Sequence, residues 1–144
     1  MIEYKSEVIV NKPVQDVFAL IKNVSRFDEW TDMNGTRLVS GEELHVGSQI
    51  ETTIKFGPVN QTMTFEVIGY EENRKVAFKT ISKGLVAWDA EYLFMPEGDS
   101  TKVISSGQLK LNGLLKISEP LLAGEIQSGE AKELVKYKEI IEMA

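Results

Sequence analysis

The chain has 144 residues, of which 42% are hydrophobic and 26% are charged, and its formal net charge at pH 7 is −6. This length and mixture fit one globular domain, residues 1–144, with enough apolar residues to bury a core. The acidic balance disfavours nucleic acid and anionic membranes as partners. The chain has no cysteine, which excludes disulfide bonds, and its single histidine, His45, argues against a metal site.

The first elements predicted from the N-terminus are a strand and two short helices. Residues 3–10 alternate between polar and apolar side chains, which predicts a half-buried strand. This start lacks the features of a signal peptide, and no run of about 18 apolar residues follows, so we expect a cytoplasmic protein without stable membrane insertion. Asn11 is a candidate cap and Pro13 a candidate first residue of a helix that ends near Lys22. Residues 23–30 predict a second short helix or turn.

Alternating side chains then continue almost without interruption, which predicts a meander of six antiparallel strands. Their expected ranges are 36–40, 49–56, 62–67, 76–80, 86–94 and 101–111. Gly57-Pro58 is predicted to form the turn after the second of these strands. Gly69 and Gly107 interrupt strands, and each marks either a bulge that curves the sheet or a close approach of two backbones.

Residues 112–143 carry the long helical pattern of this chain, with apolar residues spaced by threes and fours. The helix begins at Asn112 or only near Pro120, because proline is tolerated in a first turn but kinks a helix already begun. We expect Glu130 and Glu133 on the polar side. One stripe of the helix consists of small residues: Gly124, Ser128, Ala131 and Val135. This stripe predicts the wall of a hollow unless large residues of the sheet fill that space.

The order of these elements resembles that of the SRPBCC superfamily, which includes START lipid-transfer domains, birch-pollen-allergen-like proteins and bacterial polyketide cyclase/dehydrase-like proteins. The resemblance covers essentially the whole chain and rests on the order and spacing of VIVNKPVQDVFALI, FDEW, VGSQI and YLFMPEGDSTKV before the last helix. It implies an α+β helix-grip fold, in which a curved seven-stranded antiparallel sheet surrounds a long C-terminal helix, with two short helices after the first strand. It also implies an apolar cavity between sheet and helix.

The alternation of the strands places a set of mostly apolar side chains on the face that would line such a cavity. Together with Trp30 from the second short helix and the small stripe of the last helix, these give the predicted ligand-binding residues: Trp30, Ile54, Phe56, Met63, Phe65, Phe78, Trp88, Tyr92, Ser105, Leu109, Gly124, Ser128, Ala131 and Val135. Such a wall suits an apolar ligand that a few hydrogen bonds orient. Each of these side chains is also explained as ordinary core, because any half-buried sheet shows a similar stripe.

Three functions are compatible with this pattern. The leading hypothesis is binding or transport of a hydrophobic small molecule, such as a lipid, an isoprenoid or a polyketide-like compound, with no cofactor. The alternative is a polyketide cyclase or dehydratase-like enzyme, and an ionisable side chain inside the cavity would favour it. No catalytic residue is predicted, because the acidic residues Asp28, Glu29 and Asp32 fit exposed helix caps. A further resemblance, to chaperone-activator domains, implies an unidentified protein partner on the outer surface and a filled cavity.

Overall fold

The computed structural model describes residues 1–39, 41, 43–56 and 59–144, except for the side chains of Phe56 and Val59. The first half contains β1 (Ile2–Val10), α1 (Val14–Lys22), a 3₁₀ turn η1 (Val24–Arg26), α2 (Phe27–Trp30), β2 (Met33–Leu38), β3 (Gln49–Phe56) and β4 (Val59–Glu71). The second half contains β5 (Lys75–Thr80), β6 (Val86–Glu97), β7 (Ser100–Leu111), a 3₁₀ segment η2 (Gly113–Ser118) and α3 (Glu119–Glu142).

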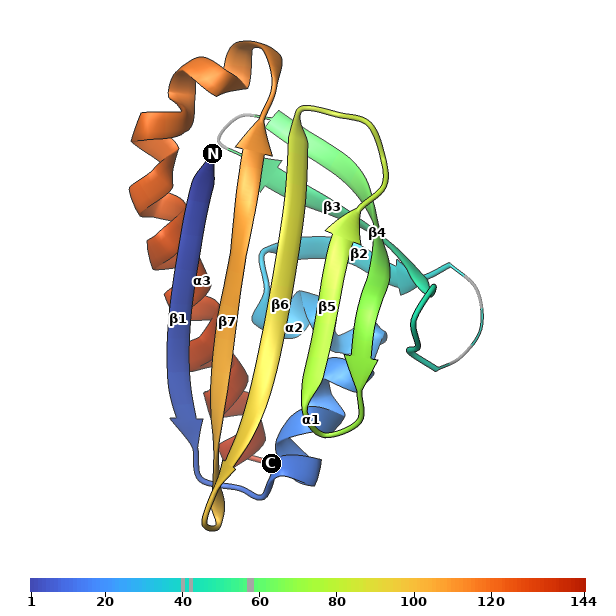
Figure 1. Ribbon diagram of the computed structural model, residues 1–144, viewed down its shortest axis with the longest axis vertical. Helices are drawn as coiled ribbons and strands as arrows, with labels where there is room; N and C mark the ends of the chain where they lie inside the picture. The colour runs from blue at the N-terminus through green and yellow to red at the C-terminus, as the bar shows by residue number, and fades with distance from the viewer. Residues whose placement is uncertain (40, 42, 57–58) are drawn as a thin grey trace.

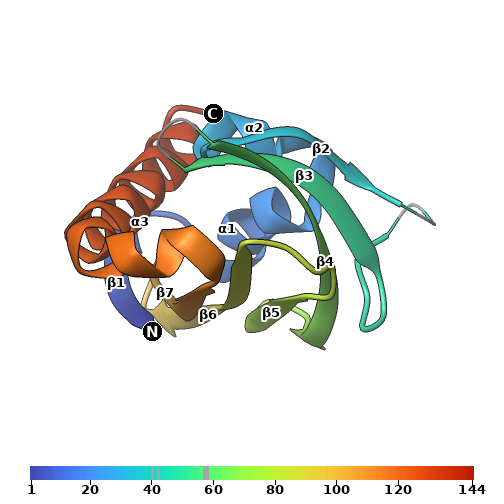
Figure 2. The same cartoon turned by 90° about the horizontal axis from the view of Figure 1, so that it is seen from above.

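The described strands form a seven-stranded sheet in the order β1-β7-β6-β5-β4-β3-β2, and every neighbouring pair is antiparallel (Figure 1). Seen from above, the sheet curves into an arc, and α3 lies across its open side (Figure 2). This arrangement confirms the predicted α+β helix-grip fold, including the two short helices that follow the first strand. The predicted Gly57-Pro58 turn lies outside the described residues.

The long helix also covers the edge of the sheet at β1. The side-chain amide of Gln127 accepts a hydrogen bond from the Lys5 N–H at 3.1 Å and donates one to the Lys5 carbonyl at 2.9 Å. The Lys138 ammonium donates to the Ile9 carbonyl at 2.6 Å. Backbone groups that an edge strand would expose are thereby paired, which protects β1 from pairing with another chain.

Two local predictions about helix starts have different outcomes. Asn11 does not cap α1: the residue before that helix is Pro13, which makes no side-chain cap, and the Asn11 side chain instead accepts a hydrogen bond from the Ser100 hydroxyl at 3.2 Å. For α3, the later of the two predicted starts is confirmed, because the helix begins at Glu119 with Pro120 in its first turn. This position suits proline, whose missing N–H has no helical partner there.

The core lies toward the α1 end of the grip. The rings of Phe18 and Phe94 meet edge to face with centroids 5.0 Å apart, and the Tyr137 hydroxyl of α3 donates to the Val17 carbonyl of α1 at 2.5 Å. These contacts fix the C-terminal half of α3 against α1 and the sheet. The N-terminal half of α3 faces the other end of the arc, where the cavity described below lies. No helix in the described ranges combines the length and the apolar character that crossing a membrane requires.

The two strand glycines serve the two purposes that the sequence left open. The pairing of β4 with β5 shifts register between Val67 and Gly69, so Gly69 lies at a bulge. A Cβ atom on Gly107 would collide with the backbone carbonyl of Asp89 and with the phenol of Tyr4. The lack of a side chain at Gly107 therefore allows the Tyr4 ring to lie directly over β7. In this position its hydroxyl reaches Trp88 of the cavity wall.

Replacing Gly107 with alanine should lower the free energy of unfolding by ~2 kcal/mol, because the added methyl group meets a backbone atom that cannot move cheaply. Gly69→Ala is the matched control: its methyl group would meet side-chain atoms of Ala77 and Lys75 at 3.3 and 3.4 Å. We expect that loss to stay below about 1 kcal/mol. Urea denaturation of both variants measures the difference, and equal losses would contradict the close-approach assignment.

Candidate functional site

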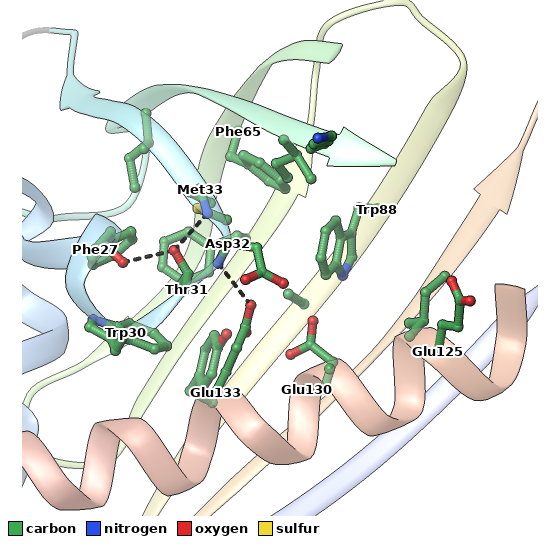
Figure 3. Close-up of a pocket in the computed structure, with 18 of the residues that line it drawn as sticks. Phe27, Trp30, Thr31, Asp32, Met33, Phe65, Trp88, Glu125, Glu130 and Glu133 are labelled. Carbon is green, nitrogen blue, oxygen red and sulfur yellow. Dashed lines mark hydrogen bonds between the residues drawn. The ribbon is translucent and has the colours of Figure 1, made fainter. Parts of the chain in front are cut away.

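A cavity of about 190 Å³ lies between the concave face of the sheet, α2 and the N-terminal half of α3 (Figure 3). Aromatic side chains from α2 and the sheet form one wall, and α3 forms the other. The lining residues are Phe27, Trp30, Thr31, Asp32, Met33, Ile50, Ile54, Lys55, Phe65, Phe78, Trp88, Ala90, Tyr92, Leu122, Glu125, Ile126, Gly129, Glu130 and Glu133. The exposed members of this set, Asp32, Lys55 and Glu125, mark the side on which the cavity meets solvent.

The sheet side of the cavity is largely the one that the strand alternation predicts. Five of the predicted strand residues line it, and the predicted Trp30 lines the cavity from α2. The five strand residues are Ile54, Phe65, Phe78, Trp88 and Tyr92. Met63, Ser105 and Leu109 are buried but do not line the cavity, and the side chain of Phe56 lies outside the described part of the chain. The role of these residues in ligand binding stays a prediction.

The helix side of the cavity differs from the prediction. Gly124, Ser128 and Val135 are exposed, Ala131 is half-buried, and none of the four lines the cavity. The small stripe is therefore a solvent-facing side of α3, and the expectation that it forms a cavity wall is wrong.

Bulky apolar residues decide which face of α3 turns inward. Leu122 and Ile126 pack against the core, and Leu134, Tyr137 and Ile141 are buried. These positions follow one another in steps of three or four residues, except that Ile126 and Leu134 are eight residues apart. The position midway between them, residue 130, also lies on the inward face but is not apolar. Glu130 therefore occupies the inward face, contrary to its predicted place on the polar side. The gap in this apolar series was the available sequence signal for a buried carboxylate.

Two glutamates of α3 bring carboxyl groups into the interior of the cavity, whose other charged lining residues, Asp32, Lys55 and Glu125, are exposed. Glu130 is only 5% exposed, and Figure 3 shows its carboxylate beside that of Glu133, both directed from the helix into the cavity. The backbone N–H of Asp32 donates to Glu133 Oε1 at 3.3 Å, and this contact joins the loop after α2 to the helix. Within the described residues no lysine or arginine forms an ion pair with either glutamate.

The surroundings of this carboxylate pair favour its protonated form. Burial raises the pKa of Glu130 to about 7, although its hydrogen bond with Glu133 opposes the rise and the charge of Asp32 adds to it. Burial, followed by the charge of Glu130, raises the pKa of Glu133 well above its ordinary value. Two carboxyl groups so close together cannot both ionise easily, so the pair holds a proton in the neutral pH range.

Phenol and indole groups lie close to the same carboxylates. The indole N–H of Trp88 donates to the Tyr4 hydroxyl at 2.9 Å. Burial, together with the negative charge of Glu130, raises the pKa of both Tyr4 and Tyr92, so both phenols remain neutral at physiological pH. The cavity therefore combines aromatic faces, the neutral phenol of Tyr92 and a proton-sharing carboxylate pair, and the phenol of Tyr4 is hydrogen-bonded to the lining residue Trp88.

The acidic residues after η1 have separate roles. The Asp28 carboxylate accepts hydrogen bonds from the N–H of Gly35 at 2.9 Å and from the hydroxyl of Thr36 at 2.5 Å, and so holds the turn that leads into β2. Glu29 pairs with Arg26 on the surface at 2.7 Å. Asp32 differs from both because it lines the cavity mouth rather than serving only as an exposed cap. Among the described residues, no group of three or more acidic, histidine or cysteine side chains is placed to hold a metal ion.

Solved structures with this architecture come from proteins of very different sequence. TTHA0849 from Thermus thermophilus is 15% identical, with 96% of each chain covered and a TM-score of 0.82. Zhui aromatase/cyclase from Streptomyces sp. R1128 is 10% identical, with 97% of this chain and 93% of that chain covered and a TM-score of 0.79. Ara h 8.0201 is 11% identical, with 99% and 98% covered and a TM-score of 0.68. These likenesses establish the fold alone.

Sequence comparison identifies the family directly. Among curated proteins none matches this chain. The family model described as "Polyketide cyclase / dehydrase and lipid transport" matches residues 1–138, which is nearly the entire chain. Together with the helix-grip fold, this match shows that the chain belongs to the polyketide cyclase/dehydrase and lipid-transport family of the SRPBCC superfamily.

Proposed function

We propose that this protein binds an apolar small molecule in the cavity between the sheet and α3. The observation that carries the proposal is the unfilled space itself, whose sheet side consists of Phe65, Phe78 and Trp88 among other apolar residues. Protein interiors are normally close-packed, so a hollow of this kind needs an occupant or costs stability. The same space counts against the chaperone-activator alternative, which implies a filled cavity.

The size of the cavity limits the part of a ligand that it can enclose. An apolar cavity of roughly 150 Å³ holds one benzene molecule, and this cavity measures about 190 Å³. One ring or a short branched chain therefore fits inside. A larger isoprenoid or polyketide-like compound would extend past Asp32, Lys55 and Glu125 into solvent.

Titration with small neutral compounds tests this proposal. Indole, phenethyl alcohol and hexanol each match the enclosed volume and carry no charge that would confuse the result. We expect at least one of them to bind, to change the fluorescence of the two tryptophans that line the cavity, and to raise the midpoint of thermal unfolding. Failure of all three to bind, together with an unchanged midpoint, would contradict the proposal.

A second candidate function is acid–base catalysis of the dehydratase type, and the carboxylate pair favours it. In the loss of water from a β-hydroxyketone, a base removes the proton next to the carbonyl and an acid protonates the departing hydroxyl group. Glu130 and Glu133 share a proton near neutral pH, so the pair contains both a base and an acid.

The aldol adduct of benzaldehyde and acetone is a suitable small substrate, because its dehydration gives a conjugated ketone that absorbs ultraviolet light. If the pair is catalytic, the protein should accelerate this reaction, and Glu130→Gln should abolish the acceleration while still binding phenethyl alcohol. An absorbance trace identical to that of buffer alone would leave ligand binding as the supported function.

A further inference from the structure

From the charges around the cavity we infer that its ligand is a cation, namely a protonated amine attached to an apolar body, with Glu130 and Glu133 as its counter-charge. This inference rests on the proposed function and names the ligand class for the same cavity. It goes beyond the family relationship, because it follows from two side chains of α3 and their neighbours in this particular chain.

Within the described part of the chain, the interior of the cavity lacks a positive charge that would compensate its carboxylates. A carboxylate moved out of water is costly unless a cation or several hydrogen bonds compensate it. Glu130 is buried, and the charged groups that act on it are Glu133 and Asp32, which are acidic as well. Among the lining residues Lys55 is the basic one, but it is exposed and its ammonium forms no ion pair in the described structure. A ligand that brings a positive charge would supply the missing compensation.

The wall opposite the two glutamates is aromatic. Figure 3 shows Trp88 across the cavity from the two glutamates, with Phe65 beyond it. The rings of Phe65 and Trp88 meet edge to face with centroids 6.2 Å apart, and those of Phe78 and Tyr92 at 6.3 Å. Aromatic faces attract cations through their ring quadrupole, and they also accommodate an apolar body. Carboxylates on one wall and aromatic rings on the other are thus complementary to an ammonium group with a hydrocarbon arm.

The same arrangement separates this ligand class from two others. A fatty acid whose carboxylate entered the cavity would meet like charges, and would be repelled. A neutral alcohol would donate one hydrogen bond but would leave the pair without a counter-charge, and hydrogen bonds between charged groups are roughly twice as strong as neutral ones. Among ligands of equal size, the order of affinity should therefore be amine, then alcohol, then acid.

Binding should also depend on pH with a defined sign. The titratable groups that line the cavity with Glu130, or whose pKa it affects, are Glu133 and Glu125 from α3, Asp32 from the loop after α2, Lys55 from β3, Tyr4 from β1 and Tyr92 from β6. Glu130 loses its proton as the pH rises through about 7. An ammonium ligand should consequently bind more tightly at pH 8 than at pH 6, whereas a carboxylate ligand should show the opposite trend.

The test compares phenethylamine, phenethyl alcohol and phenylacetate by isothermal titration calorimetry at pH 6 and pH 8. At pH 8 we expect phenethylamine to bind at least about tenfold more tightly than phenethyl alcohol, with phenylacetate the weakest. Glu130→Gln and Glu133→Gln should each weaken amine binding at least about tenfold and change alcohol binding little. Glu139→Gln, an exposed position of the same helix, is the control and should bind all three compounds like the wild type.

Three results would overturn the inference, and they have different meanings for the proposed function. If phenethyl alcohol binds as tightly as phenethylamine, or if Glu130→Gln leaves the amine affinity unchanged, the ligand is not selected by charge, although the cavity still binds apolar molecules. If none of the three compounds binds, both the inference and the proposed use of this cavity fail.

Discussion

Glu130→Gln should raise the free energy of unfolding by ~3 kcal/mol at pH 8. In the folded protein, burial raises the pKa of Glu130 to about 7, from an ordinary value of 4.5 in an unfolded chain. The folded state therefore binds more protons than the unfolded state between these two pH values. The stability that the protonated form provides is fully present below pH 4.5 and is lost as the pH rises through about 7.

Urea denaturation at pH 5 and pH 8 measures this effect. Glu130 should account for roughly 2 to 3 kcal/mol of the wild-type loss between the two conditions, and the loss of Glu130→Gln should be smaller by about that amount. Glu133, whose pKa burial also raises, should keep part of the pH dependence in this variant. Surface carboxylates such as Glu29, whose pKa the hydrogen bond from Arg26 lowers, are ionised throughout this range and do not contribute. Glu139→Gln should keep the wild-type pH dependence. Parallel profiles for the wild type and Glu130→Gln would mean that Glu130 is not a buried, uncompensated carboxylate.

Gly129→Trp should abolish ligand binding, with a loss of at least about a hundredfold in affinity. Gly129 lines the cavity, and a Cβ atom added there would meet no other atom within 4 Å. An indole side chain can therefore enter and occupy most of the 190 Å³ without displacing the helix. The fold should be retained, because replacing a glycine within a helix gains several tenths of a kcal/mol in helix propensity.

Gly124→Trp is the matched control for this experiment. Gly124 lies on the same helix, its added Cβ would also meet open space, and it is exposed on the side away from the cavity. Calorimetric titration with whichever compound binds the wild type should show normal affinity for this variant. Equal losses in the two variants, or undiminished binding by Gly129→Trp, would place the ligand elsewhere on the protein.

Most of the sheet could be predicted from the sequence because its strands have a strict period of two. Phe65 lies between Thr64 and Glu66, and Ile54 lies between Thr53 and Lys55. A one-residue slip would have turned such residues into solvent. The number of strands followed from the same alternation, and the resemblance to a known superfamily added that they form one curved sheet around the last helix. Even the ambiguity at Gly69 and Gly107 was physical, since either a bulge or a close approach requires the same residue.

The inward face of α3 could not be predicted by the same reasoning. The helix carries both a small stripe and a bulky stripe, and either one could have faced the cavity. Packing decides in favour of the bulky stripe, because Leu134, Tyr137 and Ile141 bury far more apolar area than Gly124 and Ser128 could. That choice rotates Glu130 inward, against the general tendency of glutamate to remain exposed. A buried acid is therefore the feature that average burial preferences predict least well.

Native mass spectrometry of the protein purified gently from its own host tests most directly whether the cavity carries a small molecule. We expect a near-stoichiometric adduct with an apolar body and a basic nitrogen, which solvent extraction releases for identification and which Gly129→Trp fails to retain. A protein without adduct would contradict ligand binding in this cavity if it also gains no thermal stability from the neutral compounds or phenethylamine.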